Sequence, residues 1–350
     1  MYRLLGIFLT LIAGLGSAPL LAADFTVGTA AARPGQKATG FIEVPAGVDM
    51  ATNIPVVVFN GAKPGHTLAL VAGAHGTEYA SVIALERLIQ SVNPADLSGT
   101  LIVIPLVNLG SFAQKVPHLN PVDGKNMNRL YPGKPDGTQT ERASWAITKQ
   151  VVEKTDFLID FHGGDLDENL YPYAYWPKTG KEDLDTTSYG MVLAFGLDHI
   201  IIESDRPTDP NASRYLDTTA ITRGKPSITV EAGRAGTTDE KDVEALVSGS
   251  INVMRYLKML PGNATRVEHP MWISTITVLT SDHDGVFYPL VTPQSFVQSG
   301  MTLGYITDYF GNKVADVTAT KSGVVLVVCS VPSMRKGDNL AYIGEIAAAP

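Results

Sequence analysis

The sequence predicts a layered α/β domain followed by a small all-β domain. From about residue 53 to 260, short apolar runs alternate with segments of helical period, which is typical of a sheet covered on both faces. After Pro261-Gly262 the composition shifts to Val, Thr and Gly in short alternating runs without a helical period. We therefore assign residues 24–262 to an α/β domain and residues 263–350 to a β-rich C-terminal domain.

A secretory signal is predicted ahead of these domains, at residues 1–23. Arg3 supplies a positive start, an apolar core runs to Ala13, and Ala22-Ala23 offers a small-residue cleavage site. Glycine and proline interrupt the apolar stretch, which falls short of the roughly 20 apolar residues of a membrane span. We therefore expect a periplasmic or secreted protein with no stable membrane span after signal removal.

The expected elements of the α/β domain follow from local pattern. Apolar, β-branched runs bounded by turn residues predict strands at residues 54–59, 67–72, 101–106, 157–161, 199–203 and 227–230. Apolar residues at helical spacing predict helices at residues 78–92, 141–153, 187–196, 213–222 and 239–260. Residues 108–138 are rich in Pro, Gly and Asn and have no clear period. A loop of this length in a compact domain is usually functional or disordered.

A weak internal repeat marks the β-rich domain. At offsets of 38 and then 37 residues, the repeat matches Gly285, Gly300, Leu303 and Ile306 to Gly323, Gly337, Leu340 and Ile343. Two similar hairpin units facing each other would bury a common apolar face that neither could bury alone. The repeat therefore predicts a small barrel or sandwich.

Charge and cysteine content narrow the classes of partner. The 350-residue chain has a formal net charge of -8, and removal of the signal with Arg3 takes it to -9. This balance argues against a broad nucleic-acid surface. Cys329 is the only cysteine, so no intrachain disulfide can form. The sequence is compatible with an oligomer but does not define one.

The segment Ala74-His75-Gly76-Thr77-Glu78 is the strongest candidate for a metal site. It follows a predicted strand and opens a predicted helix, so an imidazole and a carboxylate three residues apart can bind one ion. His162 ends another predicted strand, and Asp160 lies on the same side two residues earlier, where it can orient the imidazole. His75, Glu78 and His162 together predict one open, catalytic zinc site per chain.

Two further motifs would complete a hydrolytic site. Glu231 follows an apolar strand and precedes a glycine turn, at the sheet edge where open α/β sheets place their ligands. A carboxylate beside a zinc-bound water can accept its proton and deliver it to a leaving amine. In the long loop, Asn128-Arg129 joins an amide to a guanidinium fork, which suits carboxylate binding.

These motifs, His75-Gly76-Thr77-Glu78, Asn128-Arg129, Asp160-Phe161-His162-Gly163 and Val230-Glu231-Ala232-Gly233, resemble the succinylglutamate desuccinylase/aspartoacylase family, which is related to the zinc carboxypeptidases. The resemblance covers nearly the whole mature chain. It implies a mixed sheet flanked by helices, as in zinc carboxypeptidases, and a biotinyl/lipoyl-like β-fold for the C-terminal domain. It also implies zinc ligation by His75, Glu78 and His162, catalysis by Glu231, and substrate binding by Asn128 and Arg129.

The resemblance raises two questions about arginines. Arg142 matches a position at which relatives carry an arginine after the loop, and is a third candidate for substrate binding. Relatives often carry another arginine upstream of the Asp-Gly-x-Asn-x-Asn-Arg stretch, where it polarises the scissile carbonyl. This chain has none there, so the candidates for that role are Lys115 and His118 nearby, or Arg214 and Arg234 from elsewhere.

The sequence thus predicts an exported zinc metallohydrolase of linear amide C–N bonds, a deacylase of an N-acyl amino acid or similar small carboxylated amide. A second hypothesis is an exported metallocarboxypeptidase that acts on peptides, cell-wall peptides included. A third is a zinc-binding or ligand-binding protein without catalysis. The shape of the substrate pocket would distinguish the deacylase from the carboxypeptidase, because a covered pocket admits only small amides and an open groove admits peptides.

Overall fold

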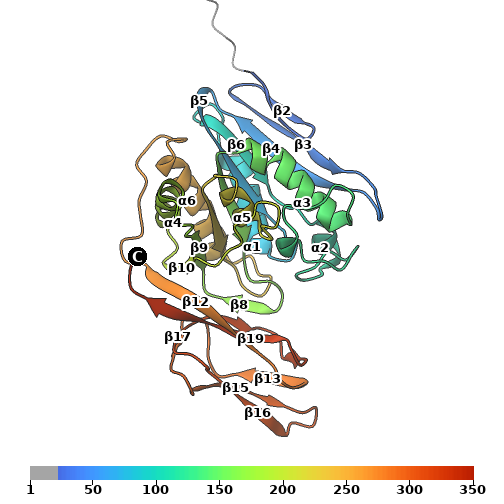
Figure 1. Ribbon diagram of the computed structural model, residues 1–350, viewed down its shortest axis with the longest axis vertical. Helices are drawn as coiled ribbons and strands as arrows, with labels where there is room; N and C mark the ends of the chain where they lie inside the picture. The colour runs from blue at the N-terminus through green and yellow to red at the C-terminus, as the bar shows by residue number, and fades with distance from the viewer. Residues whose placement is uncertain (1–22) are drawn as a thin grey trace, which may run out of the picture.

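The protein consists of an α/β body with a β-rich extension at one end (Figure 1). The computed structural model describes residues 23–350. The predicted secretory signal, apart from its last residue, lies outside these described residues. Within them, no helix combines the length and apolarity needed to cross a membrane.

One mixed sheet runs through the whole molecule. Its strand order is β14-β17-β19-β12-β10-β9-β11-β7-β5-β6-β4-β3, with β8 beside β17. The strands of the α/β body are β3 (Gln36–Val44), β4 (Thr52–Asn60), β5 (Lys63–Ala72), β6 (Ser98–Ile104), β7 (Phe157–His162), β8 (Glu168–Leu170), β9 (Tyr173–Pro177), β10 (His199–Glu203) and β11 (Ser227–Glu231). β5, β7 and β11 are parallel, whereas β9 is antiparallel to β11. The six predicted strands are confirmed. The carboxyl ends of β5, β7 and β11 bring His75, His162 and Glu231 to one edge of the sheet.

The predictions omit the hairpin strands β1 (Phe25–Val27) and β2 (Ala30–Ala32) and the strands β3, β8 and β9. The physical reason is clear for β3 and β9. β3 has mostly exposed or half-buried residues, so it lacks the apolar run of a central strand. β9 has the sequence YAYWP, in which two tyrosines face a cavity and a proline ends the strand.

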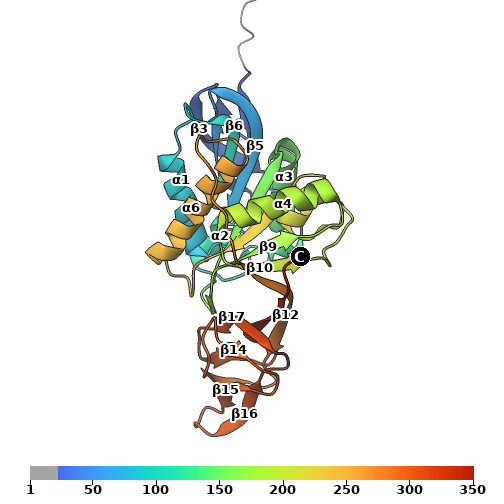
Figure 2. The same cartoon turned by 90° about the vertical axis from the view of Figure 1, so that its left-hand side faces the viewer.

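Helices cover both faces of the sheet. α1 (Tyr79–Ser91), α4 (Glu182–Phe195) and α6 (Glu240–Tyr256) pack on one face, the one turned to the viewer in Figure 2. α3 (Gln139–Gln150) and α5 (Leu216–Ile221) cover the other face. Alternate side chains of β5 point to opposite faces of the sheet. Leu68 and Leu70 pack in the core under α1, α4 and α6, whereas Ala69 and Val71 pack in the core under α3 and α5.

Two helices are shorter than predicted because the backbone turns left-handed beside them. α5 begins only at Leu216, after Arg214 at φ 67°, and α6 ends at Tyr256, before Lys258 at φ 61°.

The long loop at residues 108–138 is ordered by local contacts. It contains the short helix α2 (Leu109–Gln114), capped by the Asn108 side chain, which accepts a hydrogen bond from the Ser111 amide at 3.1 Å. Further along, the Lys125 ammonium lies 2.9 Å from the carboxylate of Glu141, in the first turn of α3. These contacts hold the segment with Asn126, Asn128 and Arg129 against the α/β body.

The β-rich part is a two-sheet sandwich that grows out of the central sheet. Its strands are β12 (Met271–Thr280), β13 (Gly285–Pro289), β14 (Phe296–Val297), β15 (Thr302–Thr307), β16 (Lys313–Thr318), β17 (Gly323–Cys329), β18 (Ser333–Met334) and β19 (Asn339–Ala347). β12 pairs with β10 through its first three residues and with β19 over the remainder. The central sheet therefore continues across the boundary predicted at residue 262, and one core cluster joins Tyr173 and Ile201 to Ile273 and Val324.

The internal repeat has the predicted structural basis. The first unit contributes the paired strands β13 and β15 to one sheet of the sandwich, and the second contributes β17 and β19 to the other. The matched residues Leu303, Ile306, Leu340 and Ile343 are all buried in the core that the sheets share. The prediction of two units with a common apolar face is confirmed.

Candidate metal and active site

The corner between β5 and α1 positions the first two candidate ligands. β5 ends at Ala72, and α1 begins at Tyr79 with Glu78 as its N-cap residue. Gly76 packs so closely on α2 that a Cβ there would lie 2.4 Å from the Phe112 amide nitrogen. The corner therefore requires glycine between His75 and Glu78, and both side chains enter the same cavity.

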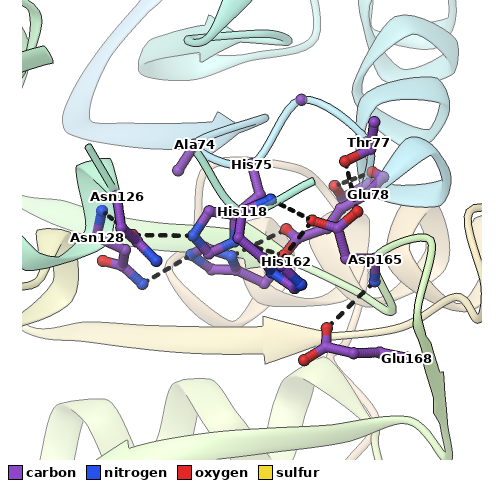
Figure 3. A network of polar contacts seen from close by, with 12 residues as sticks. Ala74, His75, Thr77, Glu78, His118, Asn126, Asn128, His162, Asp165 and Glu168 are labelled. Carbon is purple, nitrogen blue, oxygen red and sulfur yellow. Dashed lines mark hydrogen bonds and ion pairs between the residues drawn. The ribbon is translucent and has the colours of Figure 1, made fainter. Parts of the chain in front are cut away.

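His75, Glu78 and His162 form one compact cluster (Figure 3). The two oxygens of Glu78 lie 2.7 Å from Nδ1 of His75 and 2.9 Å from Nδ1 of His162. One potential ligand atom from each of the three residues lies within 4.8 Å of the others, and all three residues are buried. Burial alone would raise the pKa of Glu78, but the two histidines outweigh it and hold the carboxyl below its usual pKa.

The outer ring nitrogens orient both imidazoles for metal binding. Nε2 of His75 lies 3.1 Å from the Asn126 side-chain oxygen, and Nε2 of His162 lies 3.4 Å from a carboxylate oxygen of Asp160. With these outer nitrogens protonated, the Nδ1 lone pairs point towards the shared position beside Glu78. Two neutral imidazoles and a carboxylate are a ligand set of catalytic zinc sites, so the residues fit this metal.

Glu231 lies beside the cluster through strand register. β7 and β11 are parallel, and Glu231 is the partner of His162 in the ladder, about 4.8 Å away between strands. Its carboxyl lines the cavity, and burial together with the nearby carboxylates of Glu78 and Glu168 raises its pKa well above the usual value. Such a group can hold and release a proton beside the metal ligands.

The cavity around the cluster has a volume of about 710 Å³, a size typical of small-ligand pockets. Its floor is a face of the sheet made by Tyr173, Tyr175, Ile201, Glu203 and Thr229. The loop residues Asn126, Asn128 and Arg129 form one wall, and the β-rich part contributes Ser274, Asn339 and Tyr342.

The predicted loop residues Asn128 and Arg129 both reach this cavity. The Asn128 side chain lies 3.2 Å from Nε2 of His162, so it borders the cluster as well as lining the pocket. The Arg129 guanidinium donates to the Asn128 carbonyl and lies 5.1 Å from the centre of the Tyr215 ring. Arg129 therefore remains the candidate for binding a substrate carboxylate.

Arg142 does not line the cavity, so the prediction that it binds substrate is wrong. Its side chain is 6 % exposed and forms an ion pair of 2.8 Å with Asp49. It also donates to the carbonyl oxygens of Pro45 and Met50. Arg142 holds the segment before β4 onto α3, a structural role that its place in the helix did not reveal.

Of the two nearby candidates for polarising the substrate carbonyl, only His118 lines the cavity. Lys115 is exposed at the end of α2 and does not line the cavity. His118 does line it, but its ring nitrogens face Asp167 at 2.8 Å and Asp165 at 3.3 Å. Burial opposes protonation, yet these carboxylates raise the pKa of His118 to about 9, so it is a cation with both N–H groups engaged.

The two distant arginines also lie outside this cavity. Arg234 pairs with Asp239 at 2.8 Å, and Arg214 joins the strand-like bridge with Tyr131.

Several cavity residues were missed by sequence reasoning. They belong to one group at the far end of the floor, namely Tyr175, Glu203, Arg206, Tyr215 and Asp217. The only local signal was a charge-dense Glu203-Ser-Asp-Arg206 segment directly after a predicted strand.

The chain matches a family model and is similar to a curated protein over most of its length. A family model, the succinylglutamate desuccinylase/aspartoacylase catalytic domain, matches residues 64–257, more than half of the chain. The chain is similar to N-alpha-acetyl-L-2,4-diaminobutyric acid deacetylase of Halomonas elongata, with 26% identity over 317 residues that cover 88% of this chain and 91% of the relative.

Solved structures share the whole architecture. The product-bound ectoine utilization protein EutE (DoeB) from Ruegeria pomeroyi has a TM-score of 0.80 and 23% identity, covering 94% of this chain and 97% of that one. A succinylglutamate desuccinylase/aspartoacylase from Rhodobacter sphaeroides has a TM-score of 0.80 and 22% identity, with 94% and 99% covered. At these identities the likeness shows the fold.

Proposed function

Since the chain belongs to the succinylglutamate desuccinylase/aspartoacylase family, we propose that it is a zinc-dependent deacylase of N-acyl amino acids. One observation carries the proposal: the buried cluster of His75, Glu78 and His162 shares a cavity with the protonatable carboxyl of Glu231. The Halomonas elongata relative is named for deacetylating an N-acetyl amino acid, which supports this substrate class.

In this mechanism each residue has a distinct task. His75, Glu78 and His162 would hold zinc, which when bound supplies Lewis-acid polarisation and an acidified water. Glu231 accepts the proton of the attacking water and delivers it to the departing amide nitrogen, a transfer that suits a buried carboxyl with a raised pKa. Arg129 binds the substrate carboxylate and so places the amide carbonyl near the cluster.

A substrate panel on the zinc-loaded, full-length protein tests the proposal. We expect amine release from N-acetyl or N-succinyl amino acids with a free carboxylate. Conversion of that carboxylate to a carboxamide should lower kcat/KM by about 10-fold or more, because the charge-assisted bond to Arg129 is lost. Bound zinc without turnover of any N-acyl amino acid or peptide would instead establish the non-catalytic alternative.

A second cavity favours including peptides in the same panel. It has a volume of about 1030 Å³ and adjoins the first through His118, Glu168, Val327, Asn339 and Tyr342, which line both. A longer acyl part could extend there. Faster turnover of short peptides with a free C-terminus than of any N-acyl amino acid would identify a carboxypeptidase.

We also propose that the protein is exported. Support comes from the pattern of residues 1–23, which has the three regions of a cleavable signal. Expressed in a Gram-negative host with its natural N-terminus, the protein should be recovered from the periplasm with Asp24 as its first residue by N-terminal sequencing. Accumulation in the cytosol with residues 1–23 intact would refute export.

A further inference from the structure

The far end of the cavity floor carries a charged group that the proposed mechanism does not use. Glu203 ends β10, Asp217 lies in the first turn of α5, and Arg206 lies between them. The Arg206 Nη2 is 2.6 Å from one oxygen of Glu203 and 3.8 Å from Oδ2 of Asp217. The guanidinium also lies 3.7 Å from the centre of the Tyr215 ring.

Strand register shows that this group faces the same cavity as the metal cluster but at a distance from it. Tyr173 of β9 pairs with Glu231, and Pro177, four residues further along β9, pairs with Glu203. Four residues of strand correspond to about 13 Å. Both ends of this span line one cavity, so a ligand bound at the cluster can extend along the floor towards Glu203.

In this group the acidic side chains outnumber the basic ones. Two carboxyl groups face one guanidinium, a formal charge of -1 when both are ionised, and the Glu203 and Asp217 side chains are only 12 % and 1 % exposed. Within the described part of the chain, Oε2 of Glu203 and Oδ2 of Asp217 are buried without a hydrogen-bond donor. Burial of an unsatisfied carboxylate oxygen is costly, so both atoms favour a donor supplied by a ligand.

The titration of Glu203 agrees with this view. Burial raises its pKa to about 8 although Arg206 opposes the shift. A second positive charge beside the free oxygen would lower that pKa and stabilise the carboxylate.

An anionic ligand fits the group less well. The Nε of Arg206 is also buried without a partner, so it has one free donor for a carboxylate. However, an incoming anion would meet Glu203 and Asp217 as well, and like charges at close range repel in a buried site. The observations therefore favour a cation.

We propose that Glu203 and Asp217 bind a free, positively charged amino group of the substrate. The proposal rests on the deacylase function and names its substrate class: N-acyl diamino acids, in which one amine is acylated and the other is free. Arg206 balances part of the charge, and Tyr215 separates this subsite from Arg129, whose guanidinium lies 5.1 Å from the same ring. Carboxylate and ammonium would thus bind at neighbouring positions.

Matched substrates isolate the ammonium group. Nα-acetyl-2,4-diaminobutyrate is compared with N-acetylnorvaline, in which a methyl group replaces the free ammonium of the side chain at equal length. N-acetylaspartate serves as the anionic comparison. We expect wild-type kcat/KM to favour an acetyldiaminobutyrate over the norvaline compound by about 20-fold or more, as expected for a charge-assisted hydrogen bond. Both positional isomers are tested, because the proposal concerns the free amine.

The variant Glu203→Gln should remove this preference. We expect its kcat/KM for the cationic substrate to fall at least 10-fold more than its kcat/KM for N-acetylnorvaline, chiefly through KM. Glu43→Gln changes an exposed glutamate on β3 and should alter neither value. If Glu203→Gln does not fold, Asp217→Asn provides the same comparison.

The outcomes separate the two proposals. Equal turnover of the cationic and neutral substrates, or a preference for N-acetylaspartate, would overturn the ammonium site and leave the deacylase intact. A preference that survives in Glu203→Gln would also overturn it. No turnover of any N-acyl amino acid by the wild-type, zinc-loaded protein would overturn the deacylase itself.

Discussion

Replacement of Glu231 with glutamine should lower kcat by about 10³-fold while zinc content stays at one ion per chain. Glutamine has nearly the same shape but cannot accept a proton from water or donate one to the leaving nitrogen, and such transfers typically contribute 10²–10⁴-fold. The proposed ligands are His75, Glu78 and His162, so the metal should remain. Steady-state kinetics and elemental analysis of the same preparation measure both quantities.

Glu168→Gln is the matched control for this experiment. Glu168 lines the same cavity, and burial raises its pKa too, but its carboxylate accepts a hydrogen bond from the Asp165 amide at 3.2 Å. We expect a loss of less than about 10-fold, because a supporting hydrogen bond contributes far less than a proton transfer. Wild-type kcat together with full zinc content in Glu231→Gln would show that another group is the base.

Replacement of Glu78 with glutamine should lower zinc affinity by more than about 100-fold and abolish activity with it. Glu78 contacts both histidines, so its loss removes one ligand and the negative charge that stabilises the other two. Loss of a partner in the outer shell of a metal site typically costs 10–100-fold, and loss of a ligand should exceed this. Competition with a chromophoric chelator measures the affinity.

The variant Asn126→Ala tests a smaller loss of zinc affinity at the same site. Asn126 contacts only the outer nitrogen of His75, at 3.1 Å, so its removal should weaken zinc binding within the 10–100-fold range. Added zinc should restore activity to Asn126→Ala but not to Glu78→Gln. Zinc bound by Glu78→Gln with wild-type affinity would place the metal elsewhere.

The candidate metal site was predictable because its signals are local. A strand that turns into a helix at His75 and Glu78, and strands that end at His162 and Glu231, are visible in short windows of sequence. Parallel strands then bring their carboxyl ends to one edge, so the approximate neighbourhood of these residues follows from the fold class. The resemblance of the four motifs to one family is confirmed by the family match.

The arginines were harder to assign, because a guanidinium on a long flexible chain can serve a surface, a core or a ligand. Arg142 lies in a predicted helix and Arg206 directly follows a predicted strand, yet Arg142 binds Asp49 and backbone carbonyls while Arg206 lines the cavity. Nothing within a few residues of either one distinguishes these outcomes.

The sequence by itself determined six strands of the α/β body, the repeat in the β-rich part and the residues of the candidate metal site, since each depends on spacing along one segment. Only the tertiary structure decided what surrounds the cluster. The register of β9 with β10 and β11 places Glu203 on the cavity floor, and α5 contributes Asp217. Pairing of β12 with β10 places residues of the β-rich part in the wall of the cavity. These contacts join residues far apart in the chain, and no local pattern encodes which side chains meet across a sheet.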